Sequence, residues 1–227
     1  MSPRSYDNAK SIRELFEEFI NASDFPCIMA KAALAKSQLQ CFTATHMACP
    51  ADDGGILHFL YECVDEFKRV GNGYNSAVII FEQPVTITEA MFEDLLWQRL
   101  QALADMDAVN YGYDKRVSKD PMSGSFSFSL KEEAFYVIGL HPGSSRKARQ
   151  FALPALVFNP HAQFEALKAI NKYEPIKHAT RKRDILCSGS VNPMLEDFGT
   201  ASEALQYSGG LHDQEWKCPL DLKHFNK

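Results

Sequence analysis

The sequence lacks the motifs that mark many catalytic and metal sites. None of its seven histidines stands in an H-x-x-x-H or H-E-x-x-H pattern, and its six cysteines form no C-x-x-C pair. Segments of the types G-x-x-x-x-G-K-[ST], G-x-G-x-x-G and G-x-S-x-G are missing as well. These absences argue against a zinc hydrolase, a P-loop protein, a Rossmann-type dinucleotide-binding protein and a serine hydrolase of the α/β type.

The chain also has no long apolar run and no excess of positive charge. No stretch approaches the ~18 apolar residues that a membrane-spanning helix requires. Residues 1–21 show no apolar run followed by a small-residue cleavage site, so we expect no secretion signal, reduced thiols and a cytoplasmic protein. The net charge of −5 gives no electrostatic reason to expect a nucleic-acid partner. The basic run 177–183 is accordingly interpreted as the solvated face of a helix.

What is present is the composition of a folded globular protein. Hydrophobic residues make up 45% of the chain and charged residues 23%. The length of 227 residues suits one large domain or two small ones. Because we find no repeat, no low-complexity segment and no convincing linker, we expect one domain over 1–227, with loose termini at 1–7 and 221–227.

Hydrophobic periodicity predicts several helices and strands. Helices are expected at 8–22, 55–69, 89–105, 162–172 and 176–187. Strands are expected at 76–82 and 154–158, with a hairpin over 125–139 and a loop over 106–124. The last forty residues have weak periodicity. Because hairpins and helices mix without βαβ alternation, we predict an α+β fold with a mainly antiparallel sheet.

The most informative polar segment, GLHPGSSRKAR at 139–149, begins where the hairpin ends. His141 would stand at the tip of a buried strand. Arg146 and Arg149 would lie at positions i and i+3 on one face of a short helix, where two guanidinium groups can hold a carboxylate or a phosphate. The alternative is a plain hairpin exit with solvated arginines and a hydrogen-bonded histidine.

Two further segments could contribute to a site. Asn159 can cap the helix that follows the strand at 154–158, with His161 and Gln163 in its first turn. These side chains either face a ligand or form a satisfied helix cap. Glu203, in the turn-rich stretch 199–209, either directs a carboxylate toward a cationic substrate or lies in a surface loop.

At these same residues the sequence resembles the YqcI/YcgG-like family, and within it the branch containing the guanitoxin-pathway haem-dependent N-hydroxylase. The resemblance covers nearly the whole chain, in order. The stretches that carry it include FPCIMAKAAL at 25–34, AVIIFEQPV at 77–85, AFYVIGLHPGSSRKAR at 134–149, PALVFNPHAQFEALK at 154–168, GSVNPML at 189–195 and SEALQYSGG at 202–210.

The resemblance implies a haem b cofactor and hydroxylation of a nitrogen of arginine or a related guanidine or amine. It implies His141 as the axial iron ligand, with His161 as its competitor, and Arg146 and Arg149 as partners of the haem propionates. Further candidates for substrate contacts or the distal pocket are Asn159, Gln163, Glu203 and Gln206. The enzyme would use O2 or peroxide and an electron donor, and a homodimer is among the expected assemblies.

One departure from the branch concerns two arginines that are replaced here by Leu205 and Gly210. If they contact substrate or haem in other members, this protein differs in substrate or in haem retention. Two other functions remain open at this point. One is a non-catalytic protein that binds or traffics haem, and the other is a domain without haem whose arginine pair holds an anionic ligand.

Overall fold

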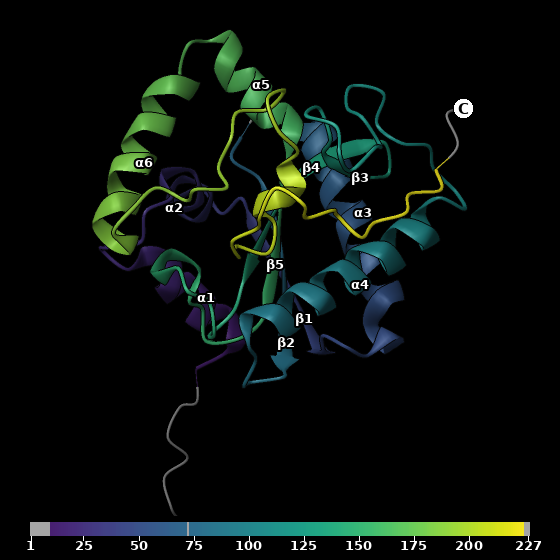
Figure 1. Ribbon diagram of the computed structural model, residues 1–227, viewed down its shortest axis with the longest axis horizontal. Helices are drawn as coiled ribbons and strands as arrows, with labels where there is room; N and C mark the ends of the chain where they lie inside the picture. Colours follow the sequence, from purple (N-terminus) through teal and green to yellow (C-terminus); the bar gives the residue numbers. More distant parts are fainter. Residues whose placement is uncertain (1–9, 72, 225–227) are drawn as a thin grey trace, which may run out of the picture.

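The computed structural model describes residues 10–71 and 73–224 and is built on one five-stranded sheet (Figure 1). The strand order is β1-β2-β5-β4-β3. The strands are β1 (Leu39–His46), β2 (Ser76–Gln83), β3 (Phe128–Leu130), β4 (Glu133–Leu140) and β5 (Ala155–Pro160). Only β1 and β2 pair in parallel, and the other three pairings are antiparallel. The predicted α+β fold with a mainly antiparallel sheet is therefore confirmed.

Helices cover both faces of this sheet. The helices α3 (Asp53–Val70) and α4 (Glu89–Asp107) pack on one face, and α1 (Ile12–Asn21) and α2 (Ile28–Ala35) pack on the other (Figure 1). The helices α5 (His161–Ala169) and α6 (Tyr173–Ser188) follow β5, and none of the residues of α6 is buried. No helix in the described part of the chain is both long and apolar enough to span a bilayer.

The two hydrophobic clusters follow from the alternation of side chains along the strands. In β2, Val78 and Ile80 belong to the cluster under α1 and α2, whereas Ile79 and Phe81 belong to the larger cluster under α3 and α4. Because β2 is buried on both faces, its sequence reads as a continuous apolar run, which is why the strand could be predicted.

The bounds of the long periodic helices and strands agree with their predictions to within a few residues. Positions 8 and 9 of the first predicted helix lie outside the described residues. Two elements, β1 and α2, were not predicted. The sequence of β1, LQCFTATH, mixes polar and apolar residues because this strand lies at the edge of the sheet. The helix α2, IMAKAALA, is apolar on nearly every side and therefore has no amphipathic pattern.

The C-terminal segment is bound more tightly than expected. His224 is 1% exposed, and its Nε2 lies 2.9 Å from Oδ2 of Asp107, which is fully buried. The other carboxylate oxygen of Asp107 accepts hydrogen bonds from the Tyr61 hydroxyl at 2.6 Å and the Lys131 amide at 3.0 Å. The expected loose terminus therefore does not hold for residues 221–224, whereas 1–7 and 225–227 lie outside the described residues.

Removal of the Asp107 carboxylate should destabilise the fold strongly. D107A leaves the buried His224 and the half-buried Tyr61 and Lys131 without their partner, and we expect the free energy of unfolding to fall by about 3–5 kcal/mol. Urea unfolding monitored by circular dichroism measures this change. D105A, at an exposed position of the same helix, should cost less than about 1 kcal/mol, and an equal loss in both variants would contradict the central role of Asp107.

Candidate functional site

A cavity of about 290 Å³ lies between the sheet and the N-terminal and C-terminal helices. Its floor is the face of β4 and β5 that points toward α1 and α2, and α5, α6 and the segment 192–206 complete its walls. That segment returns from α6 to the sheet in Figure 1. Most of the lining is apolar, including Phe16, Ile20, Met29, Ile138, Val157 and Phe198. The cavity thus suits a flat or bulky hydrophobic group with few polar contacts.

His161 and Glu203 form the polar pair of this cavity. His161 is the first residue of α5, and Glu203 opens the short 3₁₀ helix Glu203–Gln206, which Ser202 caps. Nε2 of His161 lies 3.6 Å from Oε1 of Glu203, and both side chains are more than nine-tenths buried. The ring of Phe198 lies 4.4 Å from the imidazole ring, centre to centre. Residues 42 positions apart in sequence therefore meet at one wall.

Burial controls the protonation of both groups. It lowers the pKa of His161, which favours the neutral imidazole. It raises the pKa of Glu203 to about 8, although the hydrogen bond that Oε2 of Glu203 accepts from the Ser127 hydroxyl at 2.9 Å opposes the rise. Near pH 7 the pair is therefore a neutral imidazole beside a protonated carboxylic acid. Such a pair can supply a ligand nitrogen and a proton at the same place.

The two arginines expected to clamp an anion line the cavity but are engaged by the protein itself. No helical face forms, because residues 147–149 make a single 3₁₀ turn. Nη2 of Arg146 lies 2.7 Å from Oδ2 of Asp184 and donates to the Ser190 carbonyl at 2.8 Å. Arg149 donates to the carbonyl oxygens of Gly139, Gln206 and Tyr207 at 2.9–3.1 Å. Arg149 thus ties the exit of β4 to the C-terminal segment.

Asn159 and Gln206 also line the cavity, with their amides already paired. Oδ1 of Asn159 accepts from the Ser76 hydroxyl at 2.7 Å, and its Nδ2 donates to the Tyr136 carbonyl at 3.2 Å. The Tyr136 hydroxyl bonds to Oε1 of Gln206. These bonds fix the polar floor of the cavity beside the His161 and Glu203 pair. Asn159 does not cap α5, whose N-cap position is Pro160.

His141 and Gln163 do not line this cavity. His141 is fully buried on the opposite face of the sheet, where its ring stacks on Phe92 of α4 at 4.2 Å between ring centres. Neither ring nitrogen has a partner among the described residues, and burial lowers the pKa of His141 to about 4. Gln163 lies in α5 but faces a second pocket on the other side of that helix.

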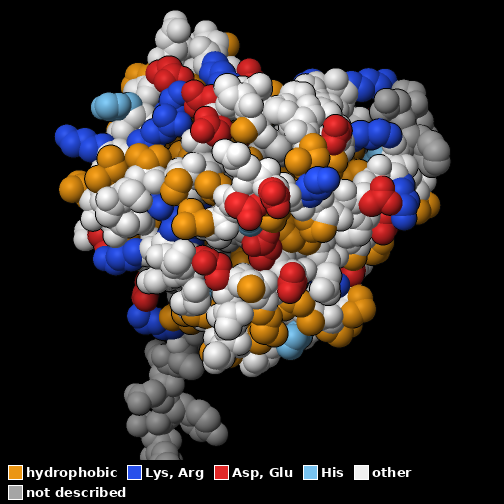
Figure 2. Space-filling model, in the orientation of Figure 1, with side chains coloured by type: hydrophobic (Ala, Val, Ile, Leu, Met, Phe, Trp, Pro, Cys, Tyr) orange, Lys and Arg blue, Asp and Glu red, His pale blue; other side chains and the backbone are white. Residues whose placement is uncertain are grey.

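The cavity also contains charged groups that sequence reasoning did not select. Oδ1 of Asp184, in α6, is buried and accepts no hydrogen bond from the described residues. Nε of Arg181 is likewise buried without a partner. Arg181 belongs to the basic run 177–183, which was interpreted only as a solvated helix face, and Asp184 directly follows that run. Figure 2 shows that basic side chains do gather over α6, at the left of the view. The apolar spacing gave no sign that one side of α6 faces a cavity.

The two positions that depart from the branch pattern lie outside the cavity lining. Leu205 is half-buried. A Cβ on Gly210 would lie 3.5 Å from Oε2 of Glu93 and 3.8 Å from Cγ of Glu89. An arginine at position 210 would therefore be close to two carboxylates of α4, and its replacement leaves the cavity walls unchanged.

The side chains that line this cavity are chemically compatible with haem. In the described part of the chain, no set of three His, Cys, Asp or Glu side chains is placed to hold a bare metal ion. A single buried, neutral histidine in an apolar cavity instead matches iron that brings its own porphyrin nitrogens. The unpartnered Nε of Arg181 can donate to a propionate carboxylate.

Comparison with known proteins gives one family and no close relative. Searches of curated proteins and of solved structures give no match. The model of the YqcI/YcgG family matches residues 16–221, which include every described strand and helix except the first residues of α1. The chain therefore belongs to the YqcI/YcgG family.

Proposed function

We propose that this protein is a haem b-dependent monooxygenase that hydroxylates a guanidine or amine nitrogen of an arginine-like small molecule, and that His161 would hold the haem iron. The observation that carries the proposal is the neutral, buried His161 beside a protonated Glu203 in an apolar cavity. His161 is favoured over His141 as the iron ligand, because the ring of His141 packs against Phe92 on the other face of the sheet.

Haem, when bound, would supply the iron at which O2 or peroxide is activated. The chain's own residues would hold the cofactor, exclude water and hold a proton. His161 would hold the iron, and the apolar walls would exclude water from the reacting atoms. Glu203 would hold a proton beside the imidazole, with the Ser127 hydroxyl fixing the orientation of the carboxyl group. Arg181 would pair with a propionate in place of the internally bonded Arg146 and Arg149.

Asp184 would recognise the cationic end of the substrate. One of its oxygens already pairs with Arg146, whereas Oδ1 is a buried acceptor without a donor among the described residues, on a side chain that lines the cavity. A guanidinium or ammonium group carries several N–H donors and one positive charge, so it suits this carboxylate oxygen. The charge of the substrate would thus set its orientation in the cavity. The cofactor would supply the chemistry that hydroxylates the substrate nitrogen.

Titration of the purified protein with haemin, followed by absorption spectroscopy, tests the proposal. We expect a saturable Soret shift at one haem per chain and, with a reductant and O2, hydroxylated product from L-arginine or a related amine detected by mass spectrometry. A Soret shift without turnover of any guanidine or amine would favour a haem-binding or haem-trafficking protein. No shift at all would refute both.

The role of Asp184 can be tested through substrate affinity. D184N removes the negative charge but keeps the shape, and we expect KM for the cationic substrate to rise about 10- to 100-fold, because a hydrogen bond to a charged group is lost. Haem affinity should stay within a factor of about two of the wild-type value. D94N, at an exposed carboxylate of α4 outside the cavity lining, is the control. Equal effects in both variants would contradict a specific contact.

A further inference from the structure

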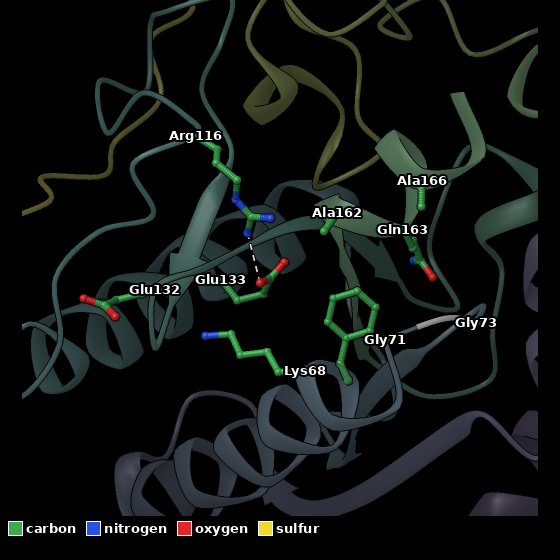
Figure 3. A pocket seen from close by; sticks show the side chains of 10 residues that line it. Lys68, Gly71, Gly73, Arg116, Glu132, Glu133, Ala162, Gln163 and Ala166 are labelled. Carbon is green, nitrogen blue, oxygen red and sulfur yellow. Dashed lines mark ion pairs between the residues drawn. The ribbon is translucent and has the colours of Figure 1, made fainter. Parts of the chain in front are cut away.

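A second pocket, of about 420 Å³, lies on the other side of α5 from the cavity described above. The end of α3, the turn between β3 and β4, and α5 form its walls, and Figure 3 shows their side chains around one open space. Lys131 and Glu132 form the turn with positive φ angles, and this places Glu133, the first residue of β4, inside the pocket. The apolar part of the lining consists of Phe67, Ala162 and Ala166.

Two buried acceptors in this pocket are without a donor. Glu133 is 3% exposed and Gln163 is 4% exposed. Oε1 of each side chain accepts no hydrogen bond from the described residues. Buried acceptors in native proteins nearly always have a partner, because an unmet one is costly. The pocket therefore calls for a ligand with N–H or O–H donors, and a negatively charged acceptor at Glu133 favours a cationic donor.

Two cationic groups stand beside the buried carboxylate. Nη2 of Arg116 lies 2.9 Å from Oε2 of Glu133 and also contacts Asp114, so this side of the guanidinium is engaged. Nη1 of Arg116 makes no hydrogen bond to the residues that the structure describes. Among the same residues, Nζ of Lys68 donates only to the Lys131 carbonyl, at 3.1 Å. In Figure 3 the Glu133 carboxylate lies between the side chains of Arg116 and Lys68.

We propose that this pocket binds a free α-amino acid with a neutral side chain. Its ammonium group would donate to Oε1 of Glu133, and its carboxylate would lie between Lys68 and Arg116. Its side chain would lie on Phe67 and the two alanines of α5. The charges of the pocket lining favour a zwitterion, because Lys68 and Arg116 are balanced by Glu132 and Glu133. This site is independent of the proposed haem chemistry, since its lining shares no residue with the haem cavity.

Isothermal titration calorimetry of the full chain with L-leucine and L-alanine tests the proposal. We expect saturable binding of at least one of them, and about tenfold or greater weakening for N-acetyl-L-leucine, which lacks the ammonium group, and for L-leucinamide, which lacks the carboxylate. E133Q should weaken binding about 10- to 100-fold, and K68M should also weaken it. E62Q, at an exposed position of α3 outside the pocket lining, should bind as the wild type does.

The outcomes separate this site from the haem site. E133Q should leave the haemin-induced Soret shift unchanged, and H161A should leave leucine binding unchanged. If E133Q does not fold, leucine binding is measured with K68M and Q163L. Both substitutions remove a polar group from the pocket and leave the ion pair between Arg116 and Glu133 in place. Equal binding of leucine and its two blocked derivatives, no binding of either amino acid, or binding confined to L-arginine would overturn the proposal.

Discussion

H161A should abolish the binding of haem, with the Soret shift lost or the dissociation constant raised at least 100-fold, while H141A keeps the shift. The reason is geometric. His161 is the histidine that lines the cavity, and His141 is enclosed on the opposite face of the sheet against Phe92. A ligand nitrogen contributes to binding only when iron can reach it. Haemin titration of both variants, compared with the wild type, measures the difference.

Addition of imidazole sharpens this test. Truncation of His161 to alanine leaves space in the cavity wall, so millimolar imidazole should restore the Soret band in H161A. Circular dichroism establishes that both variants are folded, which matters for H141A because a fully buried ring is lost. Loss of the shift in folded H141A with retention in H161A would return the ligand to His141 and require the β4 exit to rearrange.

E203Q should lower turnover about 100- to 10,000-fold, which is the usual range for loss of an acid–base group. Glutamine keeps the size and a hydrogen-bond acceptor of Glu203 but has no acidic proton that it could transfer. In the wild type the pKa of Glu203 is raised to about 8 by burial, so the rate should fall as pH rises through about 8. The variant should lack this alkaline limb. E196Q, an exposed carboxylate at the cavity wall, should retain the wild-type profile.

Stability offers a readout of Glu203 that does not depend on haem. The pKa of Glu203 in the folded state lies above the ordinary value of 4.5, so the folded protein keeps a proton that the unfolded chain releases. This contribution is fully present below pH 4.5 and is lost as pH rises through about 8. Across that window the wild type should lose at most about 5 kcal/mol relative to E203Q. Parallel stability curves for the two proteins would contradict a buried, protonated carboxyl group.

Much of the fold followed from the sequence because the signals are local. The apolar run of β2 and the periodic face of α4 specify a strand and a helix without reference to any other part of the chain. The edge strand β1 and the short apolar helix α2 were missed because their patterns depend on neighbours that cover them. The side-chain alternation of β4 also indicates which way His141 points. His141 continues the face of Val137 and Gly139, and this face lies toward α4.

The sequence by itself determined that polar residues gather at the strand ends in 139–149 and 158–165 and in the turn-rich segment 202–206, since turn and cap chemistry is local. Only the tertiary structure decided which of them meet. Glu203 accepts a hydrogen bond from Ser127 and lies beside His161, and Arg146 forms an ion pair with Asp184. Arg149 finds carbonyl groups 57 and 58 residues away. Such partners depend on how the sheet and helices pack. A charged group that becomes buried needs a hydrogen-bonding partner, and packing decides which donors and acceptors lie within reach.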